Sequence, residues 1–220
     1  MMVESSPPTR LDALLDQLAT DLEPVKPLDD RPTALVLAGL FAAAVALVLA
    51  WLGPRPGLLG EDVQPMFMLR SGTLAVLAVV CVAAVVAQAH PGVGRNSQGW
   101  KVAAAMAALF PLVGAVVAFT DPAHARAMMM MPTGWQCLRM SLMTGTLCAV
   151  PMVLHLRRGA PVAPERAGLL VGLASGSLGA LAYNLHCPFD SVVYIGLWYG
   201  VAIAVAAVAG RLVVPRLIRW

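Results

Sequence analysis

The sequence predicts an all-α membrane protein, a six-transmembrane helical bundle preceded by a short cytoplasmic amphipathic helix. Composition is the first reason, because 59% of the 220 residues are hydrophobic and 12% charged, against about 45–50% and about 25% in soluble domains. The second reason is six apolar segments, each near the length of about 20 residues that crosses a hydrocarbon core. Breaks rich in Pro and Gly, the third reason, separate these segments. The formal charge of +3 is too small and too scattered to predict a nucleic-acid partner.

The chain divides into three predicted parts. Residues 1–32 form a cytoplasmic head and tether, 33–214 the transmembrane domain, and 215–220 a basic cytoplasmic tail. Because a polar stretch precedes the first apolar segment and no cleavage-site pattern follows it, we expect a membrane anchor there and not a signal peptide. The predicted spans are 33–52, 67–89, 100–120, 136–156, 166–185 and 191–214.

Basic residues predict the orientation. Lys and Arg in short loops resist translocation, so they gather on the cytoplasmic side. With the amino terminus inside, eleven of the fifteen basic residues lie inside, and only Arg55, Arg70, Arg126 and Arg139 lie outside. We therefore expect a multi-pass protein of the bacterial inner (cytoplasmic) membrane with both termini in the cytoplasm, surrounded by membrane lipid. The residues counted inside are Arg10, Lys26, Arg31, Arg95, Lys101, Arg157, Arg158, Arg166, Arg211, Arg216 and Arg219.

The fifth span is rich in small residues. Gly172, Gly176 and Ala180 recur every four positions, a spacing that lets helix backbones approach closely. This pattern favours packing within the bundle, and a dimer seam is the alternative.

The head contains an amphipathic stretch over residues 9–23. Its acidic polar face is unlike the basic face of a helix that lies on anionic lipid. Docking of the apolar stripe into a groove on another protein is therefore favoured, over packing on the protein's own cytoplasmic loops or lying on the membrane. The stripe consists of Leu11, Leu14, Leu15, Leu18 and Leu22, which recur at helical spacing.

Four cysteines fall into two groups. Cys81 and Cys148 lie in mid-span, where a cysteine is usually a small buried hydrophobe. Cys137 and Cys187 are assigned to the outer, oxidising side, where disulfides form and persist. Arg139 and His186 adjoin them in sequence, and a nearby cation would favour the reactive and metal-binding thiolate. A sensor, a structural disulfide and an inert pair all fit this pattern.

The outer side is also rich in methionine. Thioethers suit soft cations such as Cu(I), but a contiguous run points in several directions, so packing is favoured over metal binding. The outer methionines are Met66, Met68, Met128, Met129, Met130, Met131, Met140 and Met143.

Catalytic signatures are missing from the sequence. We find no phosphate loop, zinc-protease helix or nucleophile elbow, and no span has Asp, Glu or Lys near its centre, as coupled transporters usually require. The sequence therefore predicts a protein that is not an enzyme and needs no cofactor. A membrane thiol-disulfide oxidoreductase and a soft-metal transporter remain as alternatives, and the lack of C-x-x-C disfavours the first.

Several motifs carry a family resemblance. The segments 21–25 (Asp-Leu-Glu-Pro-Val), 135–138 (Trp-Gln-Cys-Leu), 157–161 (Arg-Arg-Gly-Ala-Pro) and 185–190 (Leu-His-Cys-Pro-Phe-Asp) occur in order among six spans. With them the chain resembles the NrsF-type membrane anti-sigma factors, negative regulators of extracytoplasmic-function sigma factors of the sigma F kind in proteobacteria. The resemblance covers nearly the whole chain.

The resemblance implies both a partner and a signal. It implies that the leucine stripe of the head binds and sequesters a sigma factor. It also implies that Cys137 and Cys187 sense oxidative or heavy-metal stress. The candidate ligands of a bound heavy-metal ion are Cys137, Cys187 and His186.

Overall fold

A computed structural model describes residues 10–20, 28–58, 64–90, 99–159 and 161–218. Six of its helices are long and apolar enough to cross a membrane, so the predicted class, an all-α membrane protein with six spans, is confirmed. Within the described ranges the helices are α1 (Arg10–Thr20), α2 (Arg31–Leu52), α3 (Pro65–Ala89), α4 (Gly99–Thr120), α5 (Pro122–Met129), α6 (Thr133–Arg158), α7 (Pro164–Asn184) and α8 (Val192–Ile218).

Helices α2, α3, α4, α6 and α7 begin one to three residues before the predicted spans. The last helix continues through Pro215 to Ile218, where the sequence predicted an end at 214. A short helix that the sequence did not predict, α5, follows Asp121. The Asp121 carboxylate accepts a hydrogen bond from the His124 amide at 3.0 Å, so it caps α5, and Pro122 fits the first helical position.

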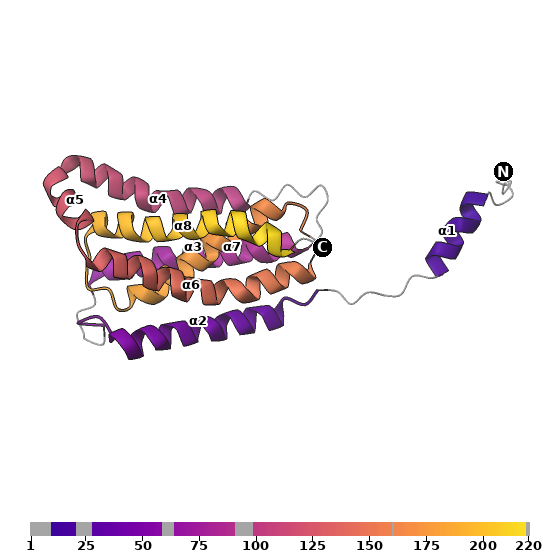
Figure 1. The fold of residues 1–220 in the computed structure, drawn as a ribbon, viewed down its shortest axis with the longest axis horizontal. Coiled ribbons are helices and arrows are strands. Elements are labelled where there is room, and N and C mark those ends of the chain that lie inside the picture. The colour runs from indigo at the N-terminus through magenta and orange to yellow at the C-terminus, as the bar shows by residue number, and fades with distance from the viewer. Residues whose placement is uncertain (1–9, 21–27, 59–63, 91–98, 160, 219–220) are drawn as a thin grey trace.

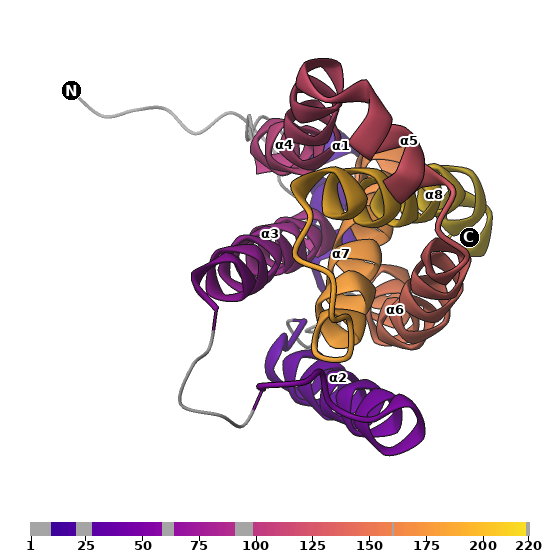
Figure 2. The same ribbon diagram turned by 90° about the vertical axis from the view of Figure 1, so that its left-hand side faces the viewer.

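Helix α7 lies at the centre of the bundle, with α2, α3, α4, α6 and α8 around it (Figure 2). It is the least apolar span, with a mean hydropathy of 1.2 against 2.7 for α2, and yet 89% of its membrane window is buried against 17% for α2. Burial in a bilayer is not driven by apolarity, because lipid tails are as apolar as a protein core. The most apolar helix therefore faces lipid, and the helix with the smallest side chains lies inside.

Glycines of α7 make this close packing possible. A Cβ atom at Gly172 would lie 2.2 Å from the Ala206 carbonyl oxygen of α8, and one at Gly179 would lie 1.9 Å from the Ser141 carbonyl oxygen of α6. Backbones meet at both points, so nothing flexible can give way. The prediction that the small residues serve packing within the bundle is confirmed.

A glycine-to-alanine pair tests this packing. Gly179→Ala should destabilise the fold by about 1–3 kcal/mol, the usual cost of overpacking. Gly72→Ala is the matched control, because Gly72 lies inside α3 with open space where its Cβ would be, and alanine there should add about 0.5–1 kcal/mol. The midpoint of unfolding by SDS in mixed micelles measures both changes. Equal midpoints for the two variants would show that the contact between α6 and α7 is loose.

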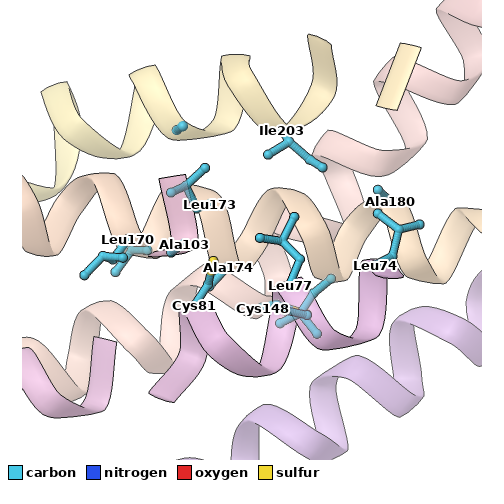
Figure 3. Packing of buried hydrophobic residues seen from close by; sticks show 14 of the residues in the cluster. Leu74, Leu77, Cys81, Ala103, Cys148, Leu170, Leu173, Ala174, Ala180 and Ile203 are labelled. Atoms are coloured by element: carbon cyan, nitrogen blue, oxygen red, sulfur yellow. The ribbon is translucent and has the colours of Figure 1, made fainter. Parts of the chain in front are cut away.

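The remaining core lies between α3, α6, α7 and α8. Figure 3 shows Cys81 and Cys148 among buried side chains that include Leu74 and Leu77. Both cysteines are fully buried and unpaired, which confirms that they pack as small hydrophobes.

Candidate functional site

The two remaining cysteines lie at one end of the bundle. Cys137 is in the second turn of α6, and Cys187 is in the connection between α7 and α8. We call this the thiol end, and the opposite end, where α2 begins and α6 ends, the head end. Both thiols are free and buried, at 0% and 1% exposure, within one hydrophobic cluster. Although they are distant in sequence, the two cysteines lie within electrostatic range of each other.

The cation nearest to these thiols is not the one expected from sequence. Arg139 is exposed on α6, because two positions along a helix place a side chain on a different face. Arg70 of α3 is buried instead, at 3% exposure, and lies within electrostatic range of Cys137. Arg70, and not Arg139, is therefore the buried guanidinium near the thiols.

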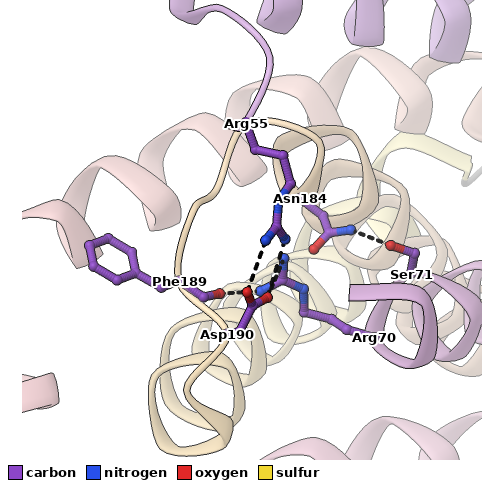
Figure 4. A network of polar contacts seen from close by, with 6 residues as sticks. All are labelled: Arg55, Arg70, Ser71, Asn184, Phe189 and Asp190. Atoms are coloured by element: carbon purple, nitrogen blue, oxygen red, sulfur yellow. Dashed lines mark hydrogen bonds and ion pairs between the residues drawn. The ribbon is translucent and has the colours of Figure 1, made fainter. Parts of the chain in front are cut away.

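Arg70 belongs to a polar cluster that holds the connection containing Cys187 (Figure 4). The Asp190 carboxylate accepts two hydrogen bonds from Arg55, at 3.2 and 2.9 Å, and forms an ion pair with Arg70 at 3.7 Å. Arg70 also donates to the Phe189 carbonyl oxygen. One carboxylate thus pairs with two buried arginines, and the bidentate pair with Arg55 is of a kind that is among the stronger polar contacts in proteins.

Aromatic rings complete the surroundings of the two guanidinium groups. The Phe67 ring lies 4.6 Å from Arg55 and 5.7 Å from Arg70, and the Tyr199 ring lies 5.9 Å from Arg70. Cation–π attraction strengthens when water is excluded. The rings therefore stabilise charges that would otherwise be costly to bury.

Backbone contacts join the same connection to the end of α2. The Arg55 amide donates to the Leu185 carbonyl oxygen at 2.9 Å, and Nδ1 of His186 donates to the Gly53 carbonyl oxygen at 2.9 Å. Gly53 has φ +82°, a conformation that residues with a Cβ rarely adopt, so the chain can leave α2 in this direction. We call the contacts of Gly53, Arg55, Arg70, Leu185, His186, Phe189 and Asp190 the thiol-end clasp.

The thiols themselves have polar neighbours. Thr133, Cys137 and Ser141 follow one another at a spacing of four on α6 and therefore share a face. Tyr194 and Tyr199 of α8 come within electrostatic range of both cysteines. Ser141 lies within hydrogen-bonding reach of Cys137, Thr133 of Tyr194, and Tyr199 of Cys187. The two buried thiols therefore have several hydroxyl groups as neighbours.

The suggested metal ligand His186 has one of its two ring nitrogens occupied. Its Nδ1 is used by Gly53, and its ring stacks edge-on against Tyr183 at 5.5 Å. Among the described residues, no three side chains of His, Cys, Asp or Glu gather where they could hold a metal ion. Two thiols are therefore what this site offers a soft cation.

The outer methionines point in several directions. Met128 and Met131 pack against the core, whereas Met130 is 75% exposed. This arrangement agrees with the packing role that the sequence favoured.

The leucine stripe lies far from the thiols. Helix α1 stands apart from the bundle in Figure 1, and its leucines Leu11, Leu14, Leu15 and Leu18 are 52–63% exposed. None of these four side chains is covered by the described part of the bundle. The fifth predicted member, Leu22, lies outside the described residues.

The chain is similar to known proteins over most of its length. The family model described as "Negative regulator of sigma F" (NrsF) matches residues 18–220. The chain belongs to the NrsF family. It is 31% identical to the anti-sigma-F factor NrsF of Caulobacter vibrioides, over 96% of this chain and 100% of the relative. It is 30% identical to the probable anti-sigma-F factor NrsF of Azospira oryzae, over 85% of this chain and 88% of the relative. No solved structure matches.

The match to the NrsF family begins at Leu18. It therefore takes in both cysteine motifs and the whole bundle, but not Leu11, Leu14 and Leu15. The alignment with the Caulobacter relative is longer and covers nearly the whole chain.

Arg55, Arg70 and Asp190 are the residues that the sequence analysis missed. A signal for them was present, since both arginines are exceptions to the rule that places basic residues inside. Asp190, a carboxylate assigned to the same side, ends one of the two cysteine motifs of this NrsF-family chain. Only the fold shows that these three side chains meet.

Proposed function

We propose that this protein is an anti-sigma factor of the inner membrane that sequesters an extracytoplasmic-function sigma factor of the sigma F kind. The observation that carries the proposal is the exposed leucine face of α1, on a chain whose relatives are named anti-sigma-F factors. A short amphipathic helix is marginal in water and needs a surface for its apolar face. An apolar groove on a sigma factor supplies that surface, and the docked helix denies the sigma factor to RNA polymerase.

The proposed orientation places the head in the cytoplasm. Eleven of the fifteen Lys and Arg residues belong to the sequence segments that are predicted to lie inside. This excess supports a cytoplasmic head end and a periplasmic thiol end. The sigma factor and the proposed sensor are then on opposite sides of the membrane. The role is regulatory, and binding and release replace catalysis.

The proposed signal is oxidation or heavy-metal binding at Cys137 and Cys187. With a peroxide, the two thiols and one hydrogen peroxide give one disulfide and two waters, so the sulfur atoms lose two electrons to the peroxide. With a soft divalent cation, the two thiols lose two protons and both sulfur atoms bind the metal. Because both thiols are buried, either reaction must disturb the packing around them.

The first experiment is co-purification of the full-length protein from membranes of its native host. We expect mass spectrometry to identify a sigma factor that is absent from mock-purified membranes. Absence of any sigma factor would overturn the proposed function and would lead to assays of bound quinone and of metal uptake into vesicles.

Single cysteine variants test the sensor separately. Cys137→Ser and Cys187→Ser should keep the sigma factor bound but lose its release by peroxide or Cd²⁺, because neither variant can form the disulfide or the two-thiolate site. Cys81→Ser and Cys148→Ser are matched controls, since both thiols are buried in mid-span, and they should release normally. A sigma-dependent reporter in the native host measures the response. Full induction in both Cys137→Ser and Cys187→Ser would disprove the sensor role.

A further inference from the structure

A second polar cluster lies at the head end of the bundle. Asp30 immediately precedes α2, and its carboxylate lies between two histidines. Nε2 of His90, at the end of α3, is 3.1 Å from Asp30 Oδ2, and Nε2 of His155, in the last turn of α6, is 3.1 Å from Asp30 Oδ1. Three helix ends that are distant in sequence therefore meet at one carboxylate.

Asp30 serves these histidines and not its own helix. It occupies the capping position of α2 but makes no side-chain hydrogen bond there, although aspartate is a preferred capping residue. The Thr33 hydroxyl, one turn further on, pairs with Nδ1 of His155 at 3.0 Å. The buried His155 ring thus contacts the first turn of α2 through both nitrogens. We call Asp30, Thr33, His90 and His155 the head-end clasp.

Helix α2 is consequently fixed at its two ends. At the thiol end, Gly53 and Arg55 contact the connection that contains Cys187. Between the clasps, residues 34–50 carry no polar side chain, and α2 is one of the least buried membrane helices. Figure 1 shows α2 along the edge of the bundle. In the chain, α2 is the first helix after α1.

We propose that α2 transmits the thiol signal to the head, with Asp30 and Arg55 as the residues that hold it in the resting position. This proposal rests on the proposed function. In the resting state both clasps are formed around reduced thiols. Reaction of Cys187 displaces its connection, which carries the partners of Gly53 and Arg55. A helix moves as a stiff unit, so the shift reaches the head-end clasp and favours the releasing state.

Two features favour α2 over α6, which also joins the two ends. Helix α6 packs against α7, α8, α2 and α3, so its movement would disrupt the core. Helix α2 packs against fewer helices, mainly α6 and α7, and it is the first span after the head in the chain.

The expected result follows from the equilibrium between the resting and the releasing state. Asp30→Ala removes contacts that stabilise the resting state, and it removes no helix cap. A larger fraction of the protein should therefore adopt the releasing state. We expect the free fraction of the sigma factor to rise about tenfold without any oxidant, the effect of 1.4 kcal/mol. The double variant Asp30→Ala with Cys137→Ser should show the same rise, because Asp30 acts after the thiols. Arg211→Gln is the matched control, since it breaks an exposed ion pair with Glu165 at the head end and leaves α2 alone.

The experiment uses the full-length protein in the native host with a sigma-dependent reporter, and the amount of each variant in the membrane is checked. Basal reporter activity that is the same in Asp30→Ala and Arg211→Gln would overturn the role of α2. If Cys137→Ser still loses induction in that case, the proposal that the thiols are the sensor stands.

A second measurement does not depend on the sigma factor. In purified full-length protein, hydrogen exchange of amides 28–40 should increase when peroxide joins Cys137 to Cys187, and should already be high in reduced Asp30→Ala. Unchanged exchange in the oxidised protein would overturn the transmission by α2. Failure of the thiols to react would overturn the sensor and the transmission together.

Discussion

Leu11→Asp, Leu15→Asp and Leu18→Asp in one chain should abolish binding of the sigma factor. Burying a leucine contributes about 1.5–3 kcal/mol, so three lost contacts remove at least about 4 kcal/mol, which is roughly a thousandfold in Kd. Charged side chains in an apolar groove add a desolvation cost. Co-purification of the sigma factor with each full-length variant, quantified by mass spectrometry, measures this loss.

The matched control introduces the same three charges on the opposite face of α1. Ala13→Asp, Gln17→Asp and Thr20→Asp lie off the leucine stripe at helical spacing, and this variant should retain most of the binding. Equal loss in both triple variants would show that charge or helix content, and not the leucine face, controls binding. Equal retention would place the sigma-binding surface outside α1.

Asp190→Ala should destabilise the bundle more than any other single polar substitution that we propose. It leaves Arg55 and Arg70 buried without their shared carboxylate, and removal of one partner of a buried ion pair costs about 3–5 kcal/mol. Both arginines are less than a tenth exposed, and Asp190 is 21% exposed, so water can replace the carboxylate only in part. The melting temperature in detergent, followed by tryptophan fluorescence, should fall by many degrees.

Glu165→Ala supplies the comparison. Its ion pair with Arg211 is exposed on both sides, and exposed pairs contribute about 0–1 kcal/mol. The melting temperature of this variant should stay close to that of the unmodified protein. Similar melting temperatures for Asp190→Ala and Glu165→Ala would show that the thiol-end clasp adds no more than a surface pair.

Helix α7 shows where sequence reasoning succeeds and where it stops. Its length and its small residues predicted a span and a packing role, because both are local properties of the chain. Its position at the centre of the bundle was not predicted, although its low mean hydropathy pointed there. In lipid, low hydropathy with small residues is a signature of an inner helix, because the outer helices must offer apolar surface to the tails.

The two clasps show the same limit for the candidate site. Cys137, Cys187 and His186 were singled out by their motifs, and Asp190 stood within one of them. His90 and His155 belong to none of these motifs, and only the structure places both of them beside Asp30.

The sequence by itself determined how many helices can span a membrane, where they begin and end to within a few residues, and which helix presents an amphipathic face. Each of these depends on neighbouring residues and on transfer from water to lipid. The tertiary structure alone decided which helix is central and which charges are paired. Arg55 and Asp190, for example, are 135 positions apart. Such pairs depend on how all the helices pack together, and no local pattern of residues encodes that arrangement.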